Sequence, residues 1–337
     1  MVERGDEVTG EYQEAAAALG ESTAEAPYPE TRVDRRGVWS FLVIAYAAAW
    51  LVDVPLWVSP RHLAAPWALA VMIGMMYTPA LATFVVTRWV SPLPGLARRT
   101  GLTFGGSFRH MAWYCLFGWL AVPAMALVAP FVAALLGVYD LDIFGLSGYR
   151  ETLAHAPGGV AIPISATMLV VIGLVGILPA AFINGLAAFG EEWGWRGYLL
   201  PRLLPLGQWR ALVLQGVAWG LWHAPILLLG YNYASHPRLG VLAMVGFTVV
   251  LGILFGWLRL STGSIWPSVL GHGALNASTG ALVYFRAAGS HPDTILAGIQ
   301  GATGWIVPLL VIALLVVLGR LPVARPPDPT PRPPRRS

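Results

Sequence analysis

The sequence predicts an all-α fold, a polytopic membrane bundle of about eight transmembrane helices. Of its 337 residues, 56% are hydrophobic and 11% are charged, whereas about a quarter of the residues in a soluble domain are charged. Apolar stretches of roughly 20 residues, the length that a helix needs to cross a bilayer, recur along the chain. Arginine is unevenly shared between the loops that join them.

The apolar stretches define the expected helices in order. They are residues 38–58, 66–90, about 110–138, 163 to about 190, about 210–230, 239–258, 264–285 and 300–319. No repeat of fixed period is evident among them.

Arginine placement predicts the orientation. If the N-terminus is cytoplasmic, the outer loops hold only Arg61, Arg150, Arg238 and Arg286, and the other arginines flank the inner ends of the helices. This is the bias of the positive-inside rule. We therefore expect a multi-pass protein of the cell membrane with both termini cytoplasmic.

The fourth apolar stretch is longer than one span requires. Residues 160–204 would measure about 60 Å as a single helix at 1.5 Å per residue. Pro179 offers a site for a kink, and part of the stretch could instead be re-entrant. If this stretch formed two spans, every later loop would lie on the opposite side of the membrane and the arginine bias would be lost. We therefore expect one kinked span.

The two ends of the chain differ from the apolar body in composition. Residues 1–36 are acidic, and residues 321–337 are rich in Pro and Arg, so both are expected to be disordered tails around a transmembrane domain of residues 37–320. Cys115 is the single cysteine, which excludes an intrachain disulfide. The net charge of +4 gives no indication of nucleic-acid binding.

Charged groups within the apolar segments are the candidates for function. In FGEEWGWRGYLL, residues 189–200, Glu192 and Arg196 are four residues apart, so on a helix they share a face and can form an ion pair. Glu191 is rotated by about 100° around the helix and has no partner in this stretch. An unpaired carboxylate in apolar surroundings suits a general base or acid.

Two later segments carry further polar groups at a similar depth. His223 lies 13 residues after Arg210, and His272 lies 13 residues after Arg259, which is about 20 Å of helix in each case. Asn276 shares a helix face with His272. Each of these groups alone could be structural, as a helix staple or as an interhelical hydrogen bond. Their matched depth favours a shared site.

The order of these motifs resembles the CPBP family of intramembrane proteases, also called the Abi or CAAX-protease family. The resemblance rests on EExxxR in residues 191–196, on an aromatic followed by xxxH in Trp219 and His223, and on HxxxN in His272 and Asn276. It covers roughly residues 165–285. Trp219 is a departure, since the family often has Phe there.

The resemblance implies a role for each motif residue. Glu191 would activate water with the help of His223, while Glu192 and Arg196 would support Glu191. His272 and Asn276 would stabilise the oxyanion. Amide hydrolysis needs a base, an oxyanion donor and an acid for the leaving amine, and these residue types can supply them without a Ser or Cys nucleophile.

The resemblance leaves the cofactor and the substrate open. We favour a metal-free mechanism; if Zn²⁺ is used, its ligands would be Glu191, His223 and His272. The expected partners are the lipid bilayer and a peptide or membrane-protein substrate, with a prenylated CAAX protein as one option.

Other classes fit the sequence less well. GxGD and HExxH, expected of presenilin-like and site-2-like proteases, are absent; GxSG, expected of a rhomboid-like protease, occurs as Gly145–Gly148, outside the expected helices. A transporter would be expected to show internal repeats. A non-catalytic scaffold or bacteriocin self-immunity protein that retains the motifs is the main alternative.

Overall fold

The computed structural model describes residues 32–104, 107–155 and 164–323, and in this part of the chain the expected all-α fold is confirmed. The long helices are α2 (Arg35–Val58), α6 (Phe108–Leu135), α8 (Ala166–Glu192), α10 (Gln208–Trp222), α12 (Pro237–Thr262), α13 (Trp266–Ser278) and α14 (Ile306–Val317). The shorter α-helices are α3 (Ala68–Met76), α4 (Thr78–Val85), α5 (Leu96–Arg99), α7 (Ser147–Ala154), α9 (Leu200–Leu203) and α11 (Ala224–Leu227). Two π-helices, Val86–Val90 and Trp193–Leu199, continue α4 and α8.

Each of the eight expected segments coincides with a helix, but their lengths differ. Five helical runs are long and apolar enough to cross a membrane: Arg35–Val58, Ala68–Val90, Phe108–Leu135, Ala166–Leu206 and Pro237–Thr262. The helices in the other three segments, α10, α13 and Ala302–Val317, are shorter. Proline and 3-10 geometry account for this, since Pro225 follows the end of α10 and α13 continues as the 3-10 helix Thr279–Val283.

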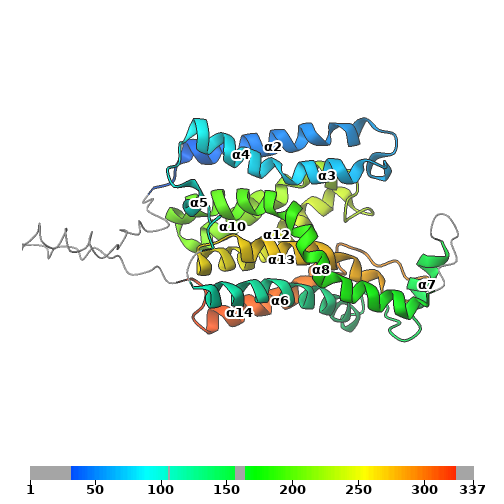
Figure 1. Ribbon diagram of the computed structural model, residues 1–337. Helices are drawn as coiled ribbons and strands as arrows, with labels where there is room; N and C mark the ends of the chain where they lie inside the picture. Colours follow the sequence, from blue (N-terminus) through cyan, green and yellow to red (C-terminus); the bar gives the residue numbers. More distant parts are fainter. Residues whose placement is uncertain (1–31, 105–106, 156–163, 324–337) are drawn as a thin grey trace, which may run out of the picture. The chain divides into compact units, whose positions relative to one another are not determined.

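The fourth segment is one continuous helical run from Ala166 to Leu206, which contains Pro179 inside α8. Figure 1 shows that α8 changes direction along its length. Of the predicted tails, residues 1–31 and 324–337 lie outside the described residues. At the N-terminal end, α2 begins at Arg35, because Asp34 caps it by accepting a hydrogen bond from the backbone N–H of Gly37 at 2.9 Å.

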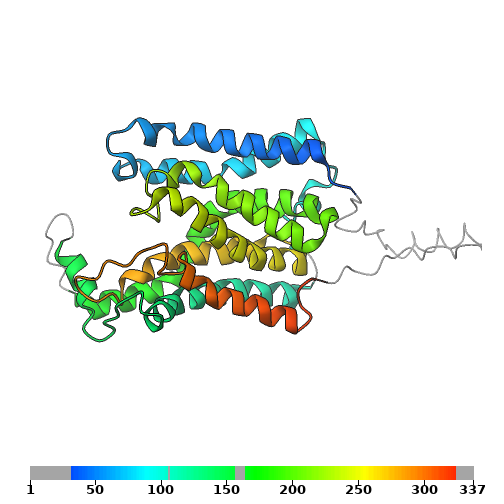
Figure 2. The ribbon, with the colours of Figure 1, turned by 180° about the vertical axis from the view of Figure 1, so that it is seen from behind.

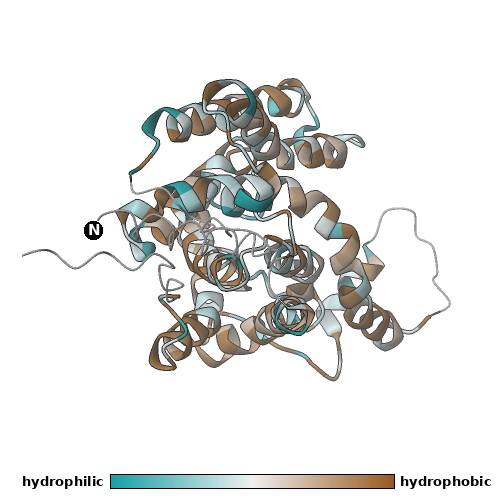
Figure 3. Ribbon diagram, turned by 60° about the vertical axis from the view of Figure 1, so that its left-hand side comes forward, coloured by the Kyte–Doolittle hydropathy of each residue, from teal (hydrophilic) through white to brown (hydrophobic). Residues whose placement is uncertain are grey.

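The long helices run side by side, and the start of α2 and the end of α14 lie at the same end of the bundle as α5 (Figures 1 and 2). Figure 3 shows hydrophobic residues around the outside of the helices. Large apolar side chains such as Leu51, Val175 and Ile183 are about 70% exposed: 72%, 66% and 72%. Such an apolar exterior on a helical bundle is the surface that lipid covers, so this is a multi-pass membrane protein.

Small residues bring the helices of the core together. A Cβ atom on Gly216 of α10 would lie 2.6 Å from Cα of Val249 in α12, and one on Gly273 of α13 would lie 2.2 Å from the carbonyl oxygen of Ala181 in α8. Only glycine permits these approaches, as in other membrane bundles. They bring α10 against α12 and α13 against α8.

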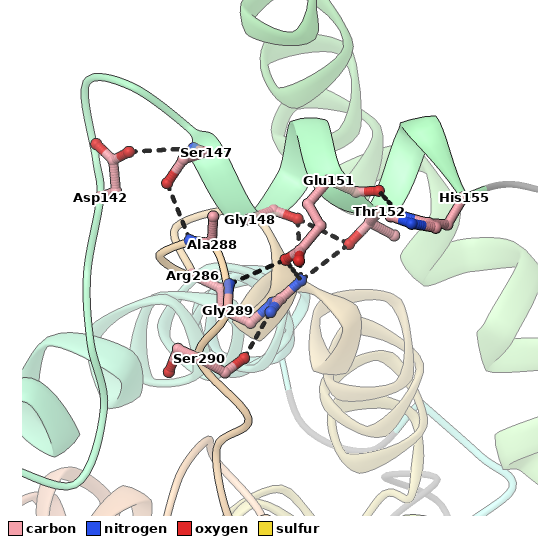
Figure 4. A network of polar contacts seen from close by, with 10 residues as sticks. All are labelled: Asp142, Ser147, Gly148, Glu151, Thr152, His155, Arg286, Ala288, Gly289 and Ser290. Carbon is pink, nitrogen blue, oxygen red and sulfur yellow. Dashed lines mark hydrogen bonds and ion pairs between the residues drawn. The ribbon is translucent and has the colours of Figure 1, made fainter.

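At the other end of the bundle, α7 is attached to the segment that follows α13 (Figure 4). Arg286 donates to Glu151 Oε2 at 3.0 Å and to the carbonyl oxygen of Gly148 at 3.1 Å, and the backbone N–H of Gly289 donates to Glu151 Oε2 at 3.2 Å. Arg286 also pairs with Leu141 in an isolated antiparallel bridge. This network joins segments of the chain that flank different helices.

Candidate active site

The two adjacent glutamates lie at the last positions of α8, where the helix changes from α to π geometry. Both are buried, Glu191 at 2% exposure and Glu192 at 0%. A Cβ atom on Gly190 would lie 2.5 Å from the carbonyl oxygen of Met76, so the absence of a side chain lets α8 contact the junction of α3 and α4. π-Bulges are frequent at functional sites.

Glu192 is the acceptor in a buried ion-pair network. Its Oε1 accepts from Nη1 of Arg196 at 2.7 Å and from Nδ1 of His272 at 2.8 Å. The pair with Arg196 predicted from the spacing is therefore confirmed. Because the ionised carboxylate can only accept, Nδ1 of His272 carries the proton, and Nε2 is left to face a reacting group.

Glu191 is held by a residue from a different helix. The indole Nε1 of Trp219 in α10 donates to Oε2 of Glu191 at 2.6 Å. Among the described residues, Oε1 of Glu191 and Nε2 of His272 have no hydrogen-bond partner, yet unlike Glu192 Oε2 they retain accessible surface. These two atoms are the open polar positions of the cluster.

Aromatic rings enclose the charged side chains. The guanidinium carbon of Arg196 lies 3.9 Å from the ring centroid of Trp219 and 5.2 Å from that of Phe255. His272 packs edge-on to Trp219 at 5.3 Å and stacks on Phe255 at 5.8 Å. Cation–π contact of this kind compensates in part for removing a guanidinium from water.

His223 lies at the C-terminal cap of α10, beside the same tryptophan. Its Nδ1 is 2.9 Å from the carbonyl oxygen of Trp219, and its ring centroid is 6.0 Å from that of Trp219. A carbonyl oxygen only accepts, so Nδ1 carries the proton and Nε2 of the neutral ring is an acceptor. Trp219 thus links His223 to Glu191.

Asn276 lies one turn beyond His272 in α13, as the i, i+4 spacing predicts. It is half-buried, and in the described part of the chain its carboxamide makes no hydrogen bond. The network therefore joins Glu191, Glu192, Arg196, Trp219 and His272 directly and does not include Asn276.

Comparison with known proteins supports this grouping. Residues 173–278, which span all the motif residues, match the family described as type II CAAX prenyl endopeptidase Rce1-like. Over these residues the chain is similar to the CAAX-protease family. A stretch of 57 residues is 39% identical to CAAX prenyl protease 2 of Methanococcus maripaludis, and this match covers 17% of the chain and about a fifth, 21%, of that relative.

The fit of the site residues to a metal ion can be tested on their geometry. Among the described residues, no three His, Cys, Asp or Glu side chains are grouped so that they could hold a metal ion. Hydrogen bonds to Trp219 and Glu192 occupy Oε2 of Glu191 and Nδ1 of both histidines but leave the other oxygen and nitrogen of each side chain available, so they do not decide the question. In this arrangement the side chains of Glu191, His223 and His272 are not grouped around a common metal position, and we derive no step through a metal.

Three arginines that the orientation argument counted at the inner ends of the helices are buried within the protein. Arg196, Arg202 and Arg259 were assigned to the inner flanks of the helices, yet they are 0%, 3% and 0% exposed. Arg259 donates from Nε to the backbone oxygen of Arg196 at 3.2 Å. The π-helix leaves backbone carbonyls outside the α-helical pattern, and a guanidinium with several donors can satisfy them.

The sequence pattern did not assign hydrogen-bonding roles to Trp219 or Arg259. A buried tryptophan needs a partner for its N–H, and this rule, applied to an aromatic one turn before His223, was the available signal. No local pattern identifies Phe255, because its contact with His272 depends on how α12 packs against α13.

Proposed function

We propose that this protein is an intramembrane endopeptidase of the CAAX-protease type, with Glu191 as the base that activates water. The observation that supports the proposal most directly is a buried cluster in a membrane-spanning bundle: Glu192 accepts hydrogen bonds from Arg196 and His272, and the adjacent Glu191 accepts one from Trp219. Ionisable groups are costly in such a place and are functional by default.

The chemistry follows from which atoms are open. Oε1 of Glu191 takes a proton from a water molecule, and the oxygen of that water attacks the carbonyl carbon of the scissile amide. Glu191 then gives the proton to the leaving amine, so base and acid are the same group at successive steps. Nε2 of His223, the acceptor end of its ring, orients the water.

The negative charge that develops on the carbonyl oxygen needs donors. We assign this role to Nε2–H of His272 in its protonated form and to the carboxamide of Asn276. Glu192 supports the protonated ring, because its carboxylate accepts from Nδ1 at 2.8 Å. Arg196 is the counter-charge of Glu192 through the 2.7 Å pair. The carboxamide of Asn276 has no hydrogen-bond partner among the described residues, so it can donate to the substrate without breaking an existing bond.

The substrate class proposed is a peptide or the tail of a membrane protein, with a prenylated C-terminal sequence as the first probe. This follows the name of the archaeal relative, CAAX prenyl protease 2. The proposed location is the cell membrane with both termini cytoplasmic. Enzymatic reporters fused at residues 1 and 337 test this, and an external reporter signal from either end would contradict it.

The test of the function compares protein termini in cells that carry the wild type, Glu191→Ala or Glu191→Gln. We expect new termini with the wild type and none with either variant, at equal amounts of protein in the membrane. A biological effect that persists in both variants would favour the non-catalytic scaffold. Asp53, a buried carboxyl outside the cluster, serves as a control through Asp53→Asn, which we expect to leave the set of termini unchanged.

A further inference from the structure

Trp219 contacts the cluster through three different parts of its structure. The indole N–H donates to Oε2 of Glu191 at 2.6 Å, one ring face lies 3.9 Å from the guanidinium carbon of Arg196, and the backbone oxygen lies 2.9 Å from Nδ1 of His223. The ring also packs against His272 at 5.3 Å. No other residue in the described part of the chain combines hydrogen bonds and ring contacts with these four site residues.

The position of the N–H matters because of the freedom of a glutamate side chain. A glutamate has three rotatable bonds, and its terminal torsion is broad. A donor on one oxygen at 2.6 Å removes that freedom and determines where the second oxygen lies. Glu191 also has a choice of partner, since Arg196 is five positions away on the same helical run. The indole occupies the space against the guanidinium and offers Glu191 a neutral donor instead.

We propose that Trp219 is a positioning residue for the reaction: its indole N–H holds Oε2 of Glu191 so that Oε1 faces the water, while its ring keeps Arg196 on Glu192. The inference rests on the proposed function. A carboxylate held in one position is already close to the geometry in which it can activate water. Misplacement of a catalytic group by about 1 Å costs on the order of 100-fold in rate. Trp219 touches neither water nor substrate in this role.

The chain contains a matched control three residues further along α10. Trp222 is also buried, at 1% exposure against 2% for Trp219, and its Nε1 donates to Oγ1 of Thr78 at 3.1 Å. Trp219→Phe and Trp222→Phe therefore each remove one indole N–H with a partner on another helix. Only the first of the two changes a contact with Glu191.

The experiment measures steady-state kinetics of the full chain in proteoliposomes with a fluorogenic peptide that ends in a farnesylated CAAX sequence. We expect Trp219→Phe to lower kcat by about 10- to 100-fold with KM within about twofold of wild type. Trp222→Phe is expected to lower kcat by less than about threefold. A purely structural role for Trp219 predicts instead equal losses in both variants, parallel to their loss of thermal stability, and would overturn the proposal.

A second substitution keeps the test decisive if Trp219→Phe does not fold. Benzothienylalanine at position 219 has the shape of tryptophan but carries sulfur in place of the N–H, so packing on Arg196 is retained and only the donor is lost. Unchanged kcat in this variant, with Glu191→Ala inactive, overturns the role of Trp219 and leaves the proposed function standing. No cleavage by the wild type contradicts the proposed function on this substrate, and the role of Trp219 fails with it.

Discussion

Nδ1 of His272 lies 2.8 Å from Oε1 of Glu192, although the two residues are 80 positions apart in the chain. The same oxygen accepts from Arg196 at 2.7 Å. One buried carboxylate oxygen therefore joins the end of α8, the π-helix that follows it and the middle of α13. Both charged side chains of the ion pair are fully buried, so neither can be removed alone without consequence.

The first prediction concerns that ion pair. Glu192→Gln leaves the guanidinium of Arg196 buried without its counter-charge, and we expect a loss of about 3–5 kcal/mol in unfolding free energy, with Arg196→Met giving a similar loss. The double variant Glu192→Gln/Arg196→Met removes both charges and is expected to recover most of the stability but no cleavage. Thermal unfolding in detergent checks this, and single variants as stable as wild type would contradict it.

Asn276 allows a cleaner separation of catalysis from stability. Its carboxamide makes no hydrogen bond within the described residues, so Asn276→Ala is expected to change stability by less than about 1 kcal/mol. If it donates to the oxyanion, cleavage falls by about 100- to 1,000-fold. Asn184→Ala in α8, which removes only a bond to the carbonyl oxygen of Ala180, is the control. Equal activity of the two variants would exclude the oxyanion role.

The approach of α8 to the junction of α3 and α4 gives a prediction about packing. In Gly190→Ala the new methyl group would lie 2.5 Å from the backbone oxygen of Met76, and backbone cannot move aside easily. We expect lower thermal stability and loss of cleavage, because Glu191 is the next residue. Gly176→Ala in the same helix meets nothing within 4 Å and is expected to be neutral or slightly stabilising. The opposite order of stability would contradict this account.

The metal-free proposal predicts that chelators have no effect. We expect cleavage by the purified protein to continue at its initial rate after prolonged treatment with 1,10-phenanthroline or EDTA. Metal analysis of the active protein is expected to show much less than one Zn²⁺ per chain. Loss of activity that added Zn²⁺ restores would show instead that Glu191, His223 and His272 rearrange to bind the metal.

The network around Glu151 predicts a pH dependence of stability. The backbone N–H of Gly289, followed by the side chain of Arg286, holds the pKa of Glu151 below its ordinary value of 4.5. A lowered pKa stabilises the folded state above pH 4.5, and this contribution is lost as the pH falls further. Glu151→Gln should therefore melt below wild type at pH 7, and the difference should shrink below pH 4.5. A difference that grows on acidification would contradict this.

Part of the site follows from local geometry and part does not. The pair of Glu192 and Arg196 is predicted because residues four apart share a helix face, and it persists even though the helix changes to π geometry between them. The same rule placed Asn276 beside His272 on α13 correctly, but it could not show that only the histidine joins the network. The i, i+4 rule says which residues share a face of one helix. It does not say which face that helix turns towards a neighbouring helix.

By itself, the sequence determined the helical class, the membrane environment and the candidate residues, because apolar length, charge content and spacing along one helix are local properties. Only the tertiary structure decided that Trp219 holds Glu191, that His272 shares an oxygen with Glu192, that Arg259 is buried against the π-helix, and that three of the eight segments form short helices. These contacts depend on how closely the helices approach one another and how they are rotated, which glycines such as Gly190 and Gly273 permit. Such contacts between distant segments leave no periodic trace in the chain.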